Sequence, residues 1–147
     1  MERAIKWVCA ACGALASFFT GLPVIMWVLI GAMTLDFVSG LITGCAGVSS
    51  KTAGGGLSSR AAFEGLLKKA QILLVVLLAV LMDVAISVSA GLVSFNAITG
   101  SVCLWFVASE GVSVLENAAE LGLPIPGVVM QALEIMQKAG TAEKTEE

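Results

Sequence analysis

The chain has 147 residues, of which 58% are hydrophobic and only 13% are charged, with a formal net charge of −3. A soluble domain has roughly half apolar and a quarter charged residues, and here the apolar excess forms charge-free runs at residues 7–35, 37–50, 70–82 and 84–109. Such runs are typical of membrane-spanning helices and leave little chain for a soluble domain. The sequence has no histidine and shows neither a metal-ligand cluster nor a catalytic pair, so we expect no enzyme and no cofactor.

The first apolar segment, residues 7–20, is short for a span, because a helix needs about 20 residues to cross a bilayer. Gly13 and Ser17 are four residues apart, a spacing that lets helices pack closely in lipid. The segment is therefore expected either to cross as a short span or to lie in the interface. Arg3 and Lys6 before it also resemble the start of a secretory leader, although one leader does not explain the apolar runs that follow.

A second apolar segment, residues 23–45, is long enough to cross the membrane and carries Asp36. At about 100° per residue, Asp36 shares one side of the helix with Ser39 and Gly40, so the acid lies on a small, polar face. Gly40 and Gly44 form a further motif for close helix packing. We expect this segment to span the membrane and to pack through that face.

The next stretch, residues 47–69, is predicted to be a cytoplasmic loop. Its first half is rich in Ser and Gly, which is typical of flexible connections, and Ser59 is placed to cap a helix that leads into the following span. Basic residues favour the cytoplasmic side, so the loop sets the expected orientation and places the C-terminus inside. Half of the basic residues of the chain lie here: Lys51, Arg60, Lys68 and Lys69.

Two further spans are predicted at residues 70–90 and 97–121, joined by a short outer turn. The first of them carries Asp83. The polar residues of the second project onto an arc of about 120°, which makes it an amphipathic membrane helix. This polar arc consists of Glu110, Ser113, Glu116, Asn117 and Glu120, and we expect Gly122 to end the helix.

The C-terminal region is predicted to leave the membrane. Residues 122–137 are expected to form a short amphipathic helix with Val129, Leu133 and Met136 toward one side, and residues 138–147 a disordered tail. The fold class is therefore an all-α membrane protein with three to four transmembrane helices within residues 1–121. Four spans are favoured, because both termini then lie on the cytoplasmic side.

Asp36, Asp83 and Glu110 lie inside predicted spans, where an ionised acid facing lipid costs roughly 2.5–3.5 kcal/mol. We expect no pairing with a buried cation of the same chain, because no basic residue falls inside a predicted span. Protonation, a wet interior or neighbouring copies would accommodate the acids instead. The polar arc would then line water in an assembly of several copies, with Asp36 and Asp83 as further lining candidates. A simpler interpretation stays open, in which each acid only hydrogen-bonds a neighbouring helix.

Several of these stretches together resemble the phage-lysis and toxin-secretion holin family. They are "LDFVSG" at Leu35–Gly40, "LSSRAAFEGLLKK" at Leu57–Lys69, Asp83 in the next span, and "EGVSVLENAAELGLPIP" at Glu110–Pro126. The resemblance implies a bacterial inner-membrane protein that oligomerises into a pore or lesion, through which an endolysin or a toxin leaves the cell without necessarily binding it. It implies the lipid bilayer and further copies as partners, and neither nucleic acid nor enzymatic activity. The acidic C-terminal tail departs from the often basic tails of the family.

The same carboxylates leave two other classes open. A small proton-coupled carrier or an ion channel subunit also places acids in the membrane, and it predicts a substrate-dependent flux in healthy cells. A structural or adaptor membrane protein predicts no change in permeability. Expression in a bacterium together with a leaderless endolysin distinguishes these classes.

Overall fold

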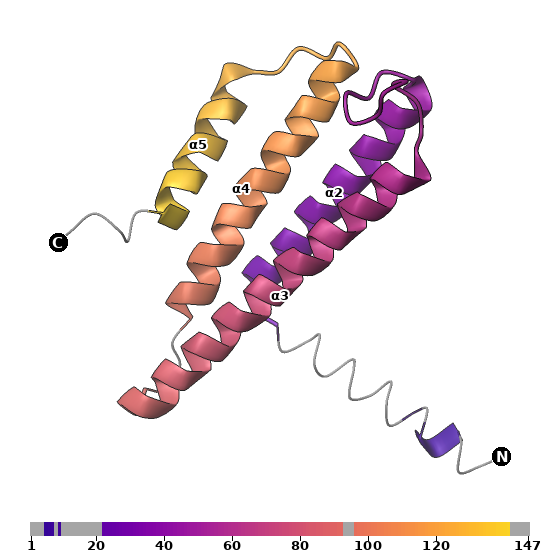
Figure 1. Ribbon diagram of the computed structural model, residues 1–147. Coiled ribbons are helices and arrows are strands. Elements are labelled where there is room, and N and C mark those ends of the chain that lie inside the picture. The colour runs from indigo at the N-terminus through magenta and orange to yellow at the C-terminus, as the bar shows by residue number, and fades with distance from the viewer. Residues whose placement is uncertain (1–4, 8, 10–21, 93–95, 142–147) are drawn as a thin grey trace.

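The structure is a computed structural model that describes residues 5–7, 9, 22–92 and 96–141. Its long helices are α2 (Val24–Ala46), α3 (Ser59–Ala90), α4 (Ala97–Glu120) and α5 (Gly127–Thr141), and the described residues contain no strand (Figure 1). The all-α class predicted from the sequence is therefore confirmed. The expected first span, with Gly13 and Ser17, lies outside the described residues except for its first positions.

Three of these helices are long and apolar enough to cross a membrane. α2, α3 and α4 have 23, 32 and 24 residues, and at about 1.5 Å per residue each exceeds the roughly 30 Å of a hydrocarbon core. α5, with 15 residues, is shorter. Whether the chain crosses three or four times depends on residues outside the described part.

The ends of α2 and α3 follow from local sequence. α2 stops at Gly47, whose φ of 75° is a left-handed conformation that glycine adopts without strain. α3 begins after Ser58, whose hydroxyl accepts a hydrogen bond from the Ala61 N–H at 3.4 Å. The capping residue is thus Ser58 and not Ser59, as the sequence had led us to expect. Residues 59–69 form the first turns of α3, in agreement with the helix start predicted near Ser59, although they were also counted as part of the cytoplasmic basic loop.

α4 is the centre of the bundle, because it packs against α2, α3 and α5, whereas α2 and α3 touch each other little. Successive helices run in opposite directions, so residues 47–58 and 121–126 lie at the same end of the bundle, which we call the loop end (Figure 1). α3 extends beyond α2 and α4 at the opposite end. Residues of α2 and α3 that point into the bundle therefore lie next to α4.

α5 runs back along α4. Gly122, with a φ of 77°, turns the chain after α4, and the half-buried side chains of α5 are Val129, Leu133 and Met136, the three expected to share one side. Leu133 lies over Gly111 of α4, so close that a Cβ at Gly111 would be 2.8 Å from its Cδ2 atom. α5 continues to Thr141, past the end expected near residue 137, and residues 142–147 lie outside the described part.

The bundle exposes apolar residues and buries polar ones. Its apolar core is small and consists of Leu29, Met33, Val76, Cys103 and Val107. The exposed face of α3 carries a dense row of leucines: Leu73, Leu74, Leu77, Leu78 and Leu81. The buried polar residues of the helices are Thr43, Lys69, Asp83, Thr99, Glu110 and Asn117. This distribution suits a molecule surrounded by lipid, where the polar groups turn inward.

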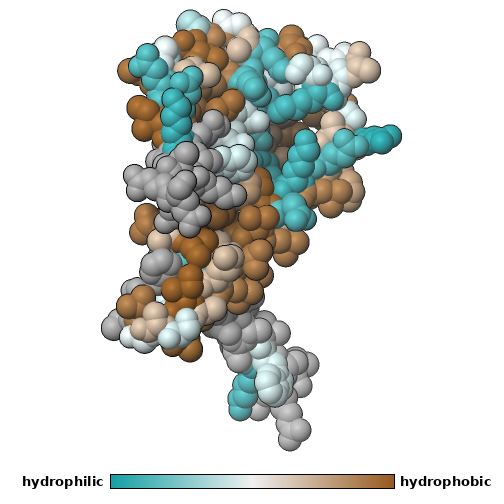
Figure 2. Space-filling view, turned by 60° about the vertical axis from the view of Figure 1, so that its left-hand side comes forward, coloured by the Kyte–Doolittle hydropathy of each residue, from teal (hydrophilic) through white to brown (hydrophobic). Residues whose placement is uncertain are grey.

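The two ends of the bundle also differ in polarity. Hydrophilic side chains gather toward the loop end, and hydrophobic ones predominate among the coloured side chains along the middle of the visible face (Figure 2). On α3, Arg60, Glu64 and Lys68 are exposed, and from Ala70 onward the next charged residue is the buried Asp83. This charge pattern predicts that the boundary between membrane and water on this helix lies close to Lys68.

Candidate functional site

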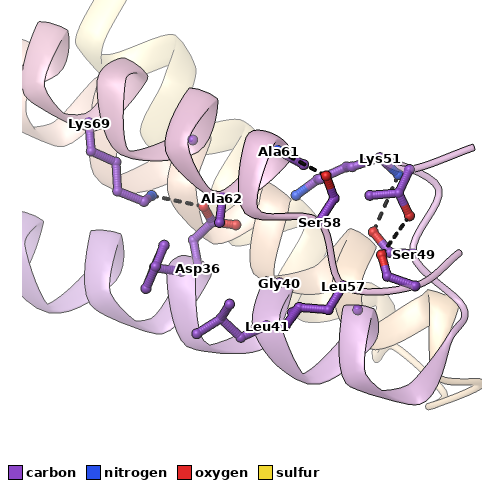
Figure 3. A pocket seen from close by; sticks show the side chains of 15 residues that line it. Asp36, Gly40, Leu41, Ser49, Lys51, Leu57, Ser58, Ala61, Ala62 and Lys69 are labelled. Carbon is purple, nitrogen blue, oxygen red and sulfur yellow. Dashed lines mark hydrogen bonds and ion pairs between the residues drawn. The ribbon is translucent and has the colours of Figure 1, made fainter.

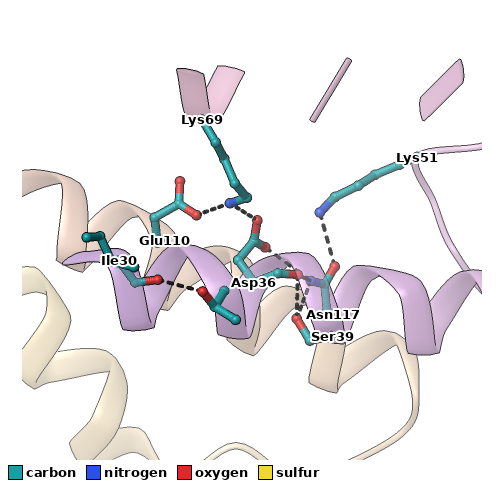
Figure 4. Close-up of polar contacts among 8 residues, drawn as sticks. Ile30, Asp36, Ser39, Lys51, Lys69, Glu110 and Asn117 are labelled. Atoms are coloured by element: carbon teal, nitrogen blue, oxygen red, sulfur yellow. Dashed lines mark hydrogen bonds and ion pairs between the residues drawn. The ribbon is translucent and has the colours of Figure 1, made fainter. Parts of the chain in front are cut away.

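One lysine joins the three long helices inside the bundle. Lys69 of α3 donates to Asp36 Oδ2 of α2 at 2.8 Å and also pairs with Glu110 Oε2 of α4 (Figure 4). The side chains are 11%, 16% and 10% exposed, respectively. The expectation that no cation of the same chain pairs with the acids is therefore wrong. Lys69 was assigned to the basic loop, but α3 begins ten residues before it and carries it into the bundle.

The neighbouring sequence explains why Lys69 points inward. Ala62, Gly65, Lys69, Ile72 and Val76 recur at three- and four-residue spacing, and all of them are half-buried or buried. On a helix this spacing forms one face. The small residues at its start leave room for the long lysine side chain, whose aliphatic part packs along the helix while the ammonium reaches the carboxylates.

Asn117 of α4 extends the network toward the loop end. Its side chain is fully buried, and its Nδ2 donates to Ser39 Oγ at 2.7 Å and to Asp36 Oδ1 at 3.2 Å. Its Oδ1 accepts from Lys51 Nζ at 3.1 Å. An unbroken chain of polar contacts thus runs from Lys51 in the loop to Asn117, Asp36, Lys69 and Glu110, and we call these five residues the polar network (Figure 4).

The polar arc of α4 is buried along one edge. Glu110 and Asn117, at the edge facing α2, are buried; Ser113 and Glu120 are half-buried; Glu116, at the far edge, is exposed. Glu120 Oε1 accepts a hydrogen bond from Ser50, which adds a second tie between the loop and α4. In this single chain, most of the arc therefore contacts protein.

Gly40 and Gly44 contribute to packing inside this chain. A Cβ on Gly40 would lie 3.7 Å from Asn117 Nδ2, and one on Gly44 would lie 3.1 Å from Leu57 Cδ1. Gly40 thus allows α2 to approach the amide of Asn117, and Gly44 makes room for the segment that enters α3. Their packing partners are in the same monomer.

Asp83 lies apart from the polar network. It is on α3, 14 residues after Lys69 and thus about 21 Å along the axis, and it is 2% exposed. Its carboxylate accepts from the backbone N–H groups of Ile98 at 3.2 Å and Thr99 at 2.8 Å. Asn96, at the cap position of α4, makes no side-chain cap bond. Asp83 therefore caps α4 from a neighbouring helix, where a negative charge is favoured by the free N–H groups and the helix dipole.

The polar network holds two negative and two positive charges in all. Asp36 and Glu110 both pair with Lys69, whereas Lys51 donates to the neutral amide oxygen of Asn117. A buried charge is costly unless it is paired and hydrogen-bonded, and here the buried Glu110 and the half-buried Asp36 share one buried ammonium. The arrangement can hold three helices together and shield the acids from lipid. Among the described residues, no group of His, Cys, Asp or Glu is placed to hold a metal ion.

Comparison with known proteins shows to which family the chain belongs. The family model of the bacteriophage holins matches residues 13–138 of the chain, a range that contains the whole polar network and Asp83. The chain belongs to the bacteriophage holin family. This family is not an enzyme family, and together with the three apolar helices it makes the chain a multi-pass membrane protein.

Individual relatives of this holin-family chain agree with the match. The "Probable holin" of Bacillus phage phi105 is 32% identical over 61% of this chain and 62% of its own length. An uncharacterized 14.9 kDa protein of Clostridium perfringens is 35% identical over 88% of this chain and 90% of its own. An uncharacterized protein of Halalkalibacterium halodurans is 28% identical over 93% and 96%. No solved structure matches the chain.

The sequence of this holin-family chain predicted the acids Asp36 and Glu110 inside the spans, but not Lys69 as the cation that pairs with them. The helix was expected to enter the membrane at residue 70, which left Lys69 outside. Extending the helical projection back to Ser59 would have placed Lys69 on the same face as Ala62, Gly65 and Ile72, and so inside the bundle. The contact of Lys51 with Asn117 joins residues 66 positions apart, and no local pattern predicts it.

Proposed function

We propose that the protein is a holin that accumulates in the bacterial cytoplasmic membrane, oligomerises, and opens a pore or lesion that releases an endolysin, or a secreted toxin. We further propose that it does so without enzymatic activity or a cofactor. Family membership supports the class of function. The observation that carries the mechanism is that the polar network satisfies the acids of α2 and α4 within one chain.

The balanced network supports a closed form that single molecules adopt at low density. With Asp36 and Glu110 paired to Lys69, and Asn117 fully bonded, these groups have no need of water. Each ionised acid would cost roughly 2.5–3.5 kcal/mol facing lipid, so α4 turns its arc toward α2 and the loop.

An assembly of several copies offers the same polar groups a second environment. If copies place their α4 helices around water, the acids and amides of the arc are hydrated and no longer need the lysine. The candidate lining residues of this open form are those of the polar arc, Glu110, Ser113, Glu116, Asn117 and Glu120, together with Asp36. Asp83 is a lining candidate only in a form of the protein in which it no longer caps α4.

The orientation is also part of the proposal. Lys51, Arg60 and Lys68 are exposed at the loop end, and basic residues near span ends favour the cytoplasm. The loop end then faces the cytoplasm, and α5, which begins at the same end, starts on that side.

Inducible expression in a bacterium together with a leaderless endolysin tests the proposal. Sudden lysis after a delay, at a time set by the amount of protein, is the expected result. Glu110→Gln removes one charge of the network and should change the time of lysis, whereas Glu134→Gln, at an exposed acid of α5, should not. Growth with an intact membrane potential at full expression would overturn the holin function, and a substrate-dependent flux in such cells would favour a carrier.

A further inference from the structure

A cavity lies beneath the loop between α2 and α3, two helices that touch each other little. It has a volume of about 90 Å³, and Figure 3 shows it bounded by Leu41 and Gly40 on one side and by Ala61 and Ala62 on the other. Small residues form much of its wall: Gly40, Gly44, Gly56, Ala61, Ala62 and Gly65. A Cβ added to Gly65 would meet no atom within 4 Å, so open space faces this position of α3.

The cavity continues outward into a polar hollow of about 570 Å³. Lys51, Thr52, Leu57 and Ser58 line both spaces. The outer hollow adds Arg60 and Glu64, which pair with each other at 3.0 Å. The two spaces together form a site that is mostly apolar inside, where the paired Asp36 and Lys69 also line it, and polar at its mouth.

The charge at the mouth is positive. Lys51 and Arg60 provide two cations against the single carboxylate of Glu64. The ammonium of Lys51 donates to the neutral oxygen of Asn117, and Lys51 makes no ion pair with the described residues. An ammonium has three N–H donors, so Lys51 retains donors for an anion without releasing Asn117.

The mouth also lies at the membrane surface. Arg60 and Glu64 precede Lys68, the residue near which the water boundary crosses α3, and the apolar cavity extends from there toward Lys69. The polar hollow is therefore at headgroup level and the cavity just beneath it. At the rim, Leu57 is 62% exposed and provides an apolar edge.

We propose that this site binds one anionic phospholipid, with its phosphate at Lys51 and Arg60 and the upper part of an acyl chain in the cavity between α2 and α3. The net positive mouth favours an anionic headgroup over a zwitterionic one, because clustered basic residues at a membrane surface attract anionic lipids. The apolar cavity favours a lipid over free phosphate. The bound lipid fills the gap between α2 and α3 and joins the loop to the spans.

Native mass spectrometry of the full chain in a neutral detergent tests this, with phosphatidylglycerol and phosphatidylcholine added in equal amounts. We expect one phosphatidylglycerol to be retained in preference to phosphatidylcholine. Lys51→Gln and Arg60→Gln should each lower that preference about fivefold, the effect of one basic residue near a membrane surface. Lys68→Gln is the matched control, because Lys68 is an exposed cation of the same helix and lines neither space.

A second pair of variants tests the cavity without changing charge. Gly65→Leu places a side chain into the open space and should abolish retention of the lipid. Gly31→Leu is its control, because Gly31 is an exposed glycine of α2 that also meets nothing within 4 Å and does not line the cavity. Both changes replace a helical glycine with a better helix former, so loss of the fold does not explain a difference between them.

Three results would overturn the proposal. Equal effects of Lys68→Gln and Lys51→Gln would mean that the attraction is general surface charge. Undiminished retention in Gly65→Leu would mean that no chain enters the cavity. Competition by sn-glycerol 3-phosphate as strong as by the whole lipid would mean that the site takes a free phosphate ester.

Discussion

The ammonium of Lys69 lies 2.8 Å from Asp36 Oδ2 and joins two helices, α2 and α3, that otherwise touch each other little. Glu110 of α4 shares the same ammonium. Lys69→Met keeps an unbranched side chain of nearly the same length and leaves the carboxylates of Asp36 and Glu110 without a cation. Breaking a buried pair in this way costs about 3–5 kcal/mol. We expect the free energy of unfolding to fall by that amount, measured by titration with sodium dodecyl sulfate in mixed micelles.

Two further variants separate the ion pair from general damage. Lys68→Met changes the exposed neighbour of Lys69 and should alter stability by less than about 0.5 kcal/mol. Lys69→Met combined with Asp36→Asn and Glu110→Gln removes the three charges of this ion cluster and should recover most of the loss. If Lys69→Met were as stable as the unchanged protein, the three groups would not form an ion cluster in solution.

Asp83 stabilises the start of α4, and this can be measured locally. Asp83→Ala leaves the N–H groups of Ile98 and Thr99 without their acceptor, which costs about 0.5–2 kcal/mol for a helix cap. We expect faster hydrogen exchange in a peptide covering residues 96–102, measured by mass spectrometry. Asp83→Asn keeps an acceptor oxygen and should have a smaller effect. Unchanged exchange in the Ala variant would contradict the capping role.

The sequence predicts the features that depend on residues close together in the chain better than the contacts between residues far apart in it. The apolar runs predict the spanning helices, because length and hydrophobicity decide membrane insertion locally. The polar arc of α4 is also local, and its burial follows the expected angular order from Glu110 to Glu116. Asp83 was found as an intramembrane acid, but its role as a cap requires knowing where α4 begins relative to α3. The role of Lys69 was missed because the span was expected to begin at residue 70, and predicting its ion pairs also requires the arrangement of three helices.

The loop depends on one glycine that no other residue can replace without strain. Gly55 has a φ of 70°, and a Cβ there would lie 2.2 Å from the carbonyl oxygen of Gly47. Gly55→Ala should therefore distort the loop, at a cost of about 1–3 kcal/mol for a strained residue, and loosen the contact of Lys51 with Asn117. We expect faster tryptic cleavage after Lys51.

Gly54→Ala provides the control for that experiment. The neighbouring glycine meets nothing within 4 Å and does not have a positive φ. Its substitution should leave the rate of cleavage after Lys51 unchanged. Equal acceleration by the two substitutions would mean that the loop is not held in the described conformation.

The docking of α5 on α4 depends on the contact between Leu133 and Gly111. A Cβ at Gly111 would approach Leu133 Cδ2 to 2.8 Å, so Gly111→Val should push α5 away at a cost of about 1–3 kcal/mol for an overpacked contact. We expect hydrogen exchange in residues 128–136 to accelerate. Leu133→Ala in the same chain makes room for the valine, so the double variant should be better protected than Gly111→Val alone.

Gly100→Val is the control on α4, because a Cβ there meets nothing within 4 Å. Additive effects of Gly111→Val and Leu133→Ala would show that the two residues do not touch, and α5 would then lie elsewhere in the membrane-bound protein.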